Sequence, residues 1–156
     1  MSTRRHDREE VFPVPAAELF ALLHTPSAIR GWWGAARVIV TAVEGGAWAA
    51  TWGDDEDAPD YTTVATLPAF DAPRRLVLGD YRYAAKTGAL PFDADFVTEF
   101  LVTEDGDGAR LKVTQRGFPA GPEADEYYAA CQEGWLRTFA GIRRFLAEQG
   151  NSQGPG

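Results

Sequence analysis

The chain is poor in the side chains that most catalytic and metal-binding sites use. Its 156 residues include one cysteine, Cys131, and two histidines, His6 and His24. A single cysteine excludes an internal disulfide, and no Cys/His pair has the spacing of a transition-metal site. A hydrolytic triad needs a nucleophile, a base and an orienting acid, yet of the three serines only Ser27 lies away from the chain ends. The sequence therefore predicts no metal site, no cofactor and no catalytic triad.

Basic residues are in the minority. The chain has 15 Lys and Arg residues against 23 Asp and Glu residues, which gives a formal net charge of −8 at pH 7. This charge repels phosphate backbones and anionic lipid surfaces, so we expect neither nucleic acid nor a membrane as a partner. The first ten residues contain no apolar stretch, and no run approaches the ~20 apolar residues of a membrane span. Together with the single thiol, these features favour the reducing cytoplasm.

Low-complexity sequence is confined to the C-terminal end. Hydrophobic residues make up 45% of the chain and charged residues 24%, an ordinary composition for one globular domain. We expect this domain to span residues 1–149, followed by a disordered tail over residues 150–156, which is rich in glycine. Acidic runs at residues 54–57 and 104–107 lack the spacing of a calcium-binding loop and are typical of solvated turns.

Hydrophobic spacing divides the chain into helices and strands. Apolar periodicity with Pro and Gly boundaries predicts short helices over residues 15–24 and 27–33. The same criteria predict a long helix of about 26 residues that begins after Pro122 and stops at Gly150. β-branched and aromatic runs predict strands over residues 37–43, 47–52, 61–67, 75–83, 96–102 and 109–116. Apolar and charged residues alternate in the last strand, which indicates an antiparallel sheet with one wet face.

Several short segments in a fixed order resemble one known family. They are residues 12–20, 26–33, 44–48, 73–77 and 109–118, followed by Gly134-Trp135 in the long helix. The series is similar to the START/Bet v 1-like (SRPBCC) superfamily, in the branch related to the C-terminal domain of the activator of Hsp90 ATPase. The resemblance implies an α+β helix-grip fold, in which a curved antiparallel sheet of about seven strands carries two short helices and packs one long C-terminal helix on its concave face. It also implies a first strand over residues 3–10, although that segment is charged on both faces.

The sequence departs from the family pattern at two places where the family often has histidine. Gln115 occupies the first, near the end of the last strand, and Gln132 and Glu133 occupy the second, just before Gly134. Glutamine orients a ligand by hydrogen bonding but carries no proton at neutral pH. A role that needs a titrating imidazole at these positions is therefore not expected in this chain.

Aromatic residues are the most informative group, at 12% of the chain. The helix-grip plan surrounds its interior with many of them, and two interpretations stay open: they fill the core, or they line a cavity for an apolar or aromatic guest. Under the second interpretation, we expect the ligand-binding residues to be Trp32, Trp33, Trp48, Trp52, Tyr81, Phe92, Phe96, Phe100, Gln115, Phe118, Tyr128, Trp135 and Phe139.

Small residues on the long helix bear on this choice. Gly134, Thr138 and Gly141 form a strip along one side, although glycine costs about 1 kcal/mol relative to alanine inside a helix. The strip either admits a loop or strand close to the helix or leaves volume for a ligand beside Trp135. Glu99 is expected to point outward, and in the reverse register it would be a buried carboxylate suited to acid–base catalysis.

Three functions follow as hypotheses. The first is a binding module that holds a small hydrophobic or aromatic ligand in an internal cavity between the sheet and the long helix, without changing it. The second is a polyketide cyclase or dehydratase that uses acid–base catalysis, with Tyr81, Gln115, Glu99 and Arg37 as its polar residues. The third, implied by the resemblance, is an interaction module that contacts an Hsp90-type chaperone. Weak homodimerisation through an exposed edge strand is a further expectation.

Overall fold

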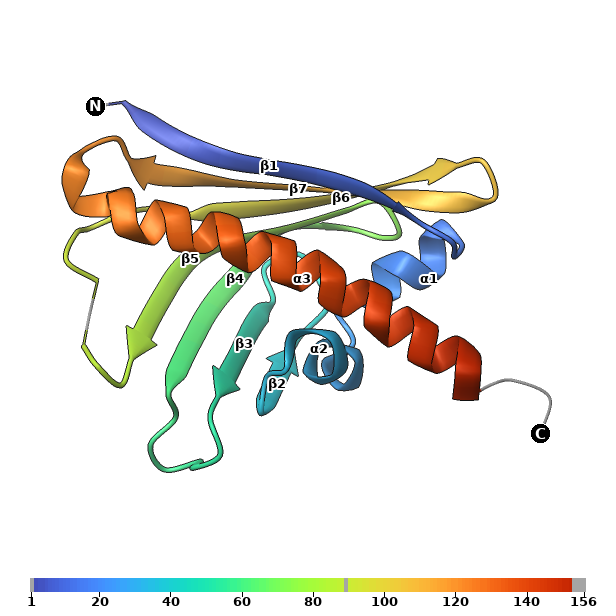
Figure 1. Ribbon diagram of the computed structural model, residues 1–156, viewed down its shortest axis with the longest axis horizontal. Helices are drawn as coiled ribbons and strands as arrows, with labels where there is room; N and C mark the ends of the chain where they lie inside the picture. Colours follow the sequence, from blue (N-terminus) through green and yellow to red (C-terminus); the bar gives the residue numbers. More distant parts are fainter. Residues whose placement is uncertain (1, 89, 153–156) are drawn as a thin grey trace.

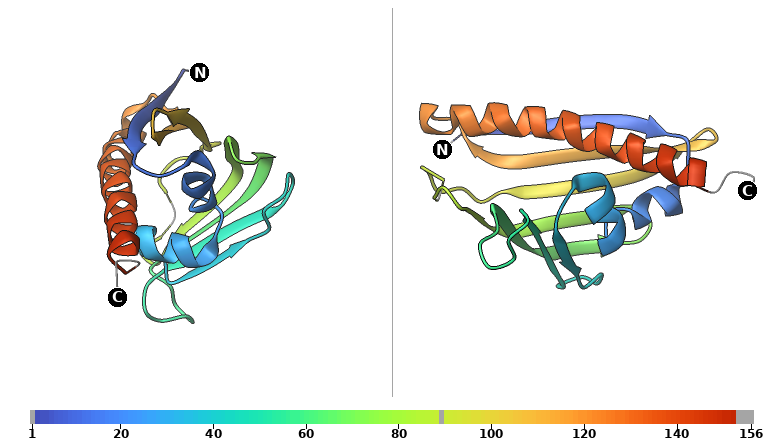
Figure 2. Two further views of the ribbon diagram at one scale, coloured as in Figure 1. Left: turned by 90° about the vertical axis from the view of Figure 1, so that its right-hand side faces the viewer. Right: turned by 60° about the horizontal axis from the view of Figure 1, so that its bottom comes forward.

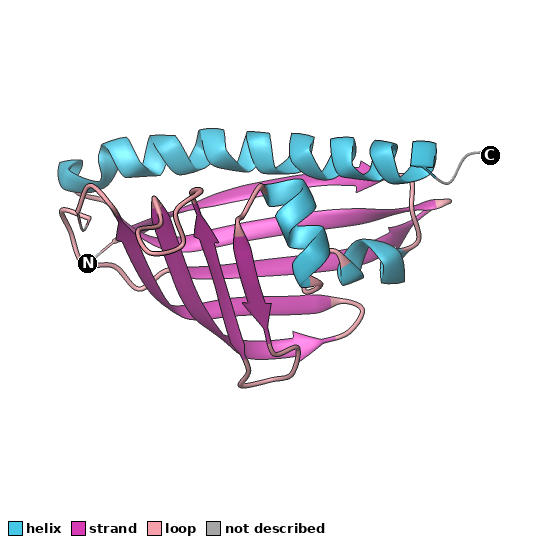
Figure 3. Ribbon diagram, turned by 90° about the horizontal axis from the view of Figure 1, so that it is seen from below, coloured by secondary structure: helices cyan, strands magenta, loops and turns pink. Residues whose placement is uncertain are grey.

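One antiparallel sheet forms most of the molecule, and the long helix α3 (Asp125–Ser152) lies along its concave face (Figures 1 and 3). The computed structural model describes residues 2–88 and 90–152. Its strands are β1 (Thr3–Phe12), β2 (Arg37–Val40), β3 (Ala47–Trp52), β4 (Tyr61–Asp71), β5 (Arg75–Ala85), β6 (Val97–Asp105) and β7 (Gly108–Pro119). The strand order β1-β7-β6-β5-β4-β3-β2 makes the first strand a neighbour of the last. The expected helix-grip architecture is confirmed.

Two short helices, α1 (Ala16–Ala21) and α2 (Pro26–Trp33), connect β1 to β2 and lie inside the curve of the sheet (Figure 2). α2 begins at Pro26, where a missing N–H is harmless, and ends at Gly34, whose φ of 73° is the left-handed conformation that glycine adopts freely. α1 contacts β6 and β7, whereas α2 contacts β2 and α3. A 3-10 turn, η1 (Pro122–Ala124), leads into α3. Among the helices of the described residues, none has the length and apolarity needed to cross a membrane.

β1 is charged on both faces because its inward side meets α3 through polar as well as apolar groups. The inward residues alternate along the strand and are Arg4, His6, Arg8, Glu10 and Phe12. The His6 ring stacks on Tyr128 of α3 with 3.9 Å between ring centroids, and the guanidinium of Arg4 lies 4.6 Å from the centroid of the same ring. The first strand that the resemblance implied is thus present, and its period is concealed by charges that face inward.

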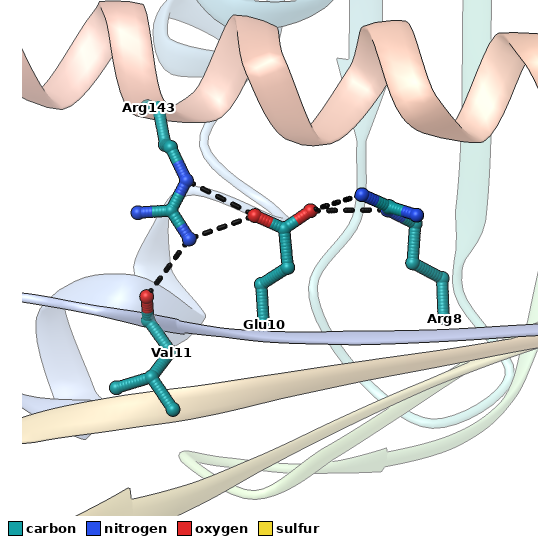
Figure 4. Close-up of polar contacts among 4 residues, drawn as sticks. All are labelled: Arg8, Glu10, Val11 and Arg143. Atoms are coloured by element: carbon teal, nitrogen blue, oxygen red, sulfur yellow. Dashed lines mark hydrogen bonds and ion pairs between the residues drawn. The ribbon is translucent and has the colours of Figure 1, made fainter.

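Glu10 joins β1 to the second half of α3 (Figure 4). Its Oε1 accepts hydrogen bonds from Nε and Nη2 of Arg143, at 3.0 and 2.7 Å, and its Oε2 accepts two from Arg8, at 3.0 and 2.7 Å. Nη2 of Arg143 also donates to the carbonyl of Val11 at 3.0 Å. Burial raises the pKa of Glu10, but the hydrogen bonds from Arg143 and Arg8 outweigh burial and hold that pKa below its ordinary value. These contacts position α3 over the sheet.

Element ends differ from the expected ones at several places. β2 stops at Val40, short of residue 43, because the chain turns there: Val43 N–H bonds to the Thr41 carbonyl at 2.9 Å and Gly46 N–H to the Val43 carbonyl at 2.9 Å. β4 and β7 run further than expected, to Asp71 and Pro119. α3 does not stop at Gly150, which keeps helical backbone, and it continues to Ser152. Of the expected disordered tail, residues 150–152 therefore belong to α3, and residues 153–156 lie outside the described residues.

Candidate functional site

A cavity of about 200 Å³ lies between the concave face of the sheet and the first half of α3. Its walls are formed by the end of α2, by strands β3 to β7 with the residue just before β6, and by one face of α3. The walls differ in chemistry: tryptophans dominate near α2 and β3, small residues line the helix, and hydroxyl and amide groups lie on the strands.

Three tryptophans form the wall where α2 meets β3. Trp33 is the last residue of α2, and Trp48 and Trp52 lie on the same face of β3. The Trp33 ring centroid is 5.6 Å from that of Trp48 and 5.8 Å from that of Trp52. Nε1 of Trp52 donates to the carbonyl of Trp33 at 3.3 Å, which fixes the end of α2 against the strand. The result is a rigid, flat apolar surface suited to contact with another ring.

Besides Trp135, the helix wall contains four residues spaced four, three and four apart, which share one face of α3: Tyr127, Cys131, Gly134 and Thr138. A Cβ built on Gly134 would meet nothing within 4 Å. The Thr138 hydroxyl donates to the Gly134 carbonyl at 2.8 Å and is thereby turned along the helix. Gly134 thus leaves volume in the cavity, as one of the two interpretations of the small-residue strip expected.

Gly141 fits the other interpretation, in which another segment of the chain approaches the helix closely. A Cβ at this position would overlap the carbonyl oxygen of Trp32, because α2 crosses α3 at close range there. The strip therefore has two functions along its length: it allows close helix packing at Gly141 and leaves open space about two turns earlier, at Gly134.

Two hydrogen bonds orient polar side chains on the strand side of the cavity. Thr98 on β6 and Gln115 on β7 are opposite each other in the register. The Tyr81 hydroxyl donates to Oγ1 of Thr98 at 2.8 Å, and Nε1 of Trp135 donates to Oε1 of Gln115 at 2.6 Å. This part of the wall presents hydrogen-bonding groups to an otherwise apolar space.

The titratable groups that line the cavity are neutral at pH 7. Burial raises the pKa of the Tyr81 hydroxyl and of the Tyr127 hydroxyl well above the ordinary value. Burial also raises the pKa of the Cys131 thiol to about 11, against the opposing effect of a hydrogen bond with Tyr127. No Asp, Glu, Lys, Arg or His occurs among the described residues of the wall. The cavity therefore suits an uncharged ligand, because an ion would lose its hydration there without gaining a counter-charge.

Seven of the residues expected from the sequence line this cavity: Trp33, Trp48, Trp52, Tyr81, Phe96, Gln115 and Trp135. The other six do not line it: Trp32, Phe92, Phe100, Phe118, Tyr128 and Phe139. The expected residues are thus divided between the cavity wall and other parts of the fold.

The six expected residues outside the cavity contact other parts of the fold. Trp32 is buried behind Trp33 and donates from Nε1 to the Leu22 carbonyl at 2.9 Å. Phe100, Phe118 and Phe139 are buried in the core. Tyr128 faces His6 on β1, and the ring of Phe92, in the loop before β6, packs on Phe96 and Tyr127.

Sequence reasoning missed several wall residues, of which Tyr127 is the most informative. Tyr128 was the expected ligand-binding residue, but its neighbour Tyr127 lines the cavity. The spacing of Tyr127, Cys131, Gly134 and Thr138 is itself helical and was available as a signal. Thr63, Tyr83 and Thr98 were also missed, and they lie on strands whose inward face alternates.

Two of the four polar residues considered for catalysis lie away from the cavity. Glu99 points outward, as expected, and accepts a hydrogen bond from Nε of Arg75 at 2.6 Å. Arg37 forms an exposed ion pair with Glu56 at 3.1 Å. Only Tyr81 and Gln115 remain at the site. Within the described part of the chain, no cluster of three His, Cys, Asp or Glu side chains is arranged to hold a metal ion.

Comparison with known families gives one match that spans most of the chain. The family described as "Activator of Hsp90 ATPase homolog 1-like protein" matches residues 13–147. No curated protein matches the sequence.

Solved structures share the fold at low sequence identity. Protein MLL2253 from Mesorhizobium loti is 20% identical, with a TM-score of 0.74 over 93% of this chain and 98% of that one. CalU16 from Micromonospora echinospora is 18% identical, with a TM-score of 0.68 over 92% and 74% of the two chains. DynU16, from the dynemicin biosynthetic locus, is 15% identical, with a TM-score of 0.72 over 92% of this chain and 47% of its own. At identities this low, the structural similarity shows a shared fold and nothing about function.

Proposed function

The chain belongs to the activator of Hsp90 ATPase homolog 1-like family, and within that family we propose that it is a binding protein for a small, uncharged aromatic or hydrophobic molecule. The ligand occupies the cavity between the sheet and α3, with its ring against the tryptophan wall. The domain acts by holding this molecule and releasing it, not by transforming it.

One observation carries the proposal: the cavity is walled by aromatic rings and by polar groups that are neutral at pH 7. Its volume of about 200 Å³ also limits the guest. An apolar cavity of ~150 Å³ in another protein takes up benzene, whereas drug-sized ligands need about 300–1,000 Å³. We therefore expect a molecule of one or two fused rings.

The cyclase or dehydratase hypothesis has less support at this site. Acid–base catalysis near pH 7 works best with a group whose pKa lies near that pH. Burial moves the pKa values of Tyr81, Tyr127 and Cys131 in the opposite direction, away from neutrality. Glu99, the carboxylate considered from the sequence, is on the outer face with Arg75. Two neighbours in fold, DynU16 and CalU16, do not change this, because their likeness concerns architecture.

The remaining expectations about setting and partners stay predictions. The cytoplasm is still the expected compartment, because Cys131 is a free thiol. Contact with an Hsp90-type chaperone has the family relationship as its support. Weak homodimerisation is supported by the outer edges of β1 and β2, the two terminal strands of the sheet, which are free to pair with another strand.

The test is thermal denaturation in the presence of naphthalene, with the alkylation rate of Cys131 as an independent measure of cavity occupancy. A ligand present at 100 times its Kd stabilises by about 2.7 kcal/mol, which raises the Tm of a domain of this size by roughly 5–11 °C. The same concentration should slow alkylation of Cys131, because the thiol lies in the cavity wall.

Two variants show whether the effect comes from the cavity. Gly134→Leu places four carbon atoms in the open space, so we expect naphthalene to lose at least tenfold in affinity. Ala130→Leu makes a similar addition on an exposed position of α3 and should bind as the wild type does. Naphthalene that neither raises the Tm nor protects Cys131 would contradict the proposed function.

A further inference from the structure

The orientation of the Gln115 side-chain amide follows from its partner. The indole Nε1 of Trp135 lies 2.6 Å from the end of this side chain, and an indole N–H donates but cannot accept. The group facing Trp135 must therefore be the amide oxygen. This leaves the NH₂ group, with two donors, pointing away from Trp135.

No described residue accepts a hydrogen bond from that NH₂ group. The register partners of Gln115 are His6 on β1 and Thr98 on β6. Nε2 of His6 donates to the Tyr128 carbonyl at 2.7 Å, and the His6 ring stacks on Tyr128 and forms no hydrogen bond with Gln115. Oγ1 of Thr98 accepts from the Tyr81 hydroxyl at 2.8 Å. Gln115 lines the cavity, so its free donors are available to a ligand there.

We propose that the cavity selects neutral aromatic ligands that carry a hydrogen-bond acceptor, such as an aryl ketone, and that the Gln115 amide N–H donates to this acceptor. The inference rests on the proposed binding function and names the class of ligand. Trp135 makes the selection possible, because its N–H holds the amide oxygen and prevents the side chain from turning over. The neutral walls exclude a carboxylate as the acceptor, since its charge would be unpaired.

The experiment compares acetophenone with α-methylstyrene, which has the same shape but a C=CH₂ group in place of C=O. The quantity measured is the ratio of their Kd values, because a substitution that changes the affinity for both probes equally leaves this ratio unchanged. In Gln115→Met, a side chain of similar length without donors, we expect the ketone to lose roughly tenfold in affinity relative to the hydrocarbon. In Gln132→Met, the same substitution on an exposed position of α3, the ratio should equal that of the wild type.

A second measurement needs no substitution. Acetophenone should shift the ¹⁵N and ¹H resonances of the Gln115 side-chain amide in the wild-type protein, because the amide donates a hydrogen bond to the ketone. α-Methylstyrene has no acceptor, so the Gln115 amide protons should keep the chemical shifts of an amide without a strong acceptor. If both probes bind, but the ratio is unchanged in Gln115→Met or the amide resonances respond equally to both, the inference is overturned and the binding function stands. If neither probe nor naphthalene binds, both are refuted.

Discussion

Two glycines in α3 offer a direct test of how the helix meets its surroundings. Gly134 and Gly141 are both inside the helix, where replacement by alanine improves intrinsic helix stability by about 1 kcal/mol. Their environments are opposite. A Cβ at Gly134 meets nothing within 4 Å, whereas a Cβ at Gly141 overlaps the Trp32 carbonyl oxygen, which belongs to backbone and cannot turn aside.

The magnitudes follow from this contrast. Gly134→Ala should gain the full helix propensity, about 1 kcal/mol, and raise the Tm by roughly 2–4 °C. Gly141→Ala has the same propensity term, but α2 must move away from α3, and overpacking of this kind costs about 1–3 kcal/mol. The propensity cancels in the comparison, so the two variants should differ by about 1–3 kcal/mol, with Gly141→Ala the less stable.

Thermal or urea denaturation of the two variants beside the wild type measures these differences. Near-ultraviolet circular dichroism gives a second signal, because a shift of α2 changes the surroundings of Trp33 and the other rings around it. Equal gains in stability at both positions would show that α2 does not press on α3 at Gly141. A loss at Gly134 would show that the space beside it is filled, which would also remove the basis of the cavity.

The contacts between β1 and α3 lead to two more predictions. Arg143→Ala removes a half-exposed ion pair with Glu10, a hydrogen bond to the Val11 carbonyl and a guanidinium that lies 4.5 Å from the Phe12 ring centroid. We expect the protein to lose about 1 kcal/mol of stability, which lowers its Tm by about 2–4 °C. Arg37→Ala, which removes a more exposed pair, should leave the Tm unchanged. For Glu10, whose pKa the fold lowers from its ordinary 4.5, the stabilisation is present above that pH and is lost as the pH falls through the folded-state pKa. Glu10→Gln should therefore be less stable than the wild type at pH 7, and the difference should shrink as the pH falls through the folded-state pKa; a difference that does not change with pH would contradict the assignment.

Local signals along the chain predicted individual elements well where the residues involved have strong backbone preferences. Pro26 and Gly34 mark the two ends of α2, and the chain reverses at Gly106, with a φ of 59°, between β6 and β7. The outward direction of Glu99 followed from alternation along its strand. These features depend on a few neighbouring residues, so they are accessible without knowledge of the fold.

Pairs of adjacent aromatic residues account for two of the six expected residues that lie outside the cavity, Trp32 and Tyr128. Trp32 and Trp33, or Tyr127 and Tyr128, differ by one position on a helix, and the sequence does not say which neighbour each will meet. In the fold Trp33 and Tyr127 face the cavity, whereas Trp32 contacts the Leu22 carbonyl and Tyr128 contacts β1. A helix that touches a strand on one side and a cavity on the other has no single inner stripe.

The amino-acid sequence by itself determined the order of the elements, the antiparallel character of the sheet and the abundance of rings in the interior, because periodicity and backbone preference are local properties. Only the tertiary structure decided which rings enclose space and which fill it, and why β1 places charges on its inward face. That outcome depends on how α3 approaches the sheet. The contact between Arg143 and Glu10 holds the helix near one end, and Gly134, which has no side chain, leaves space beside it. These partners are far apart in sequence, so no local pattern reveals their contact.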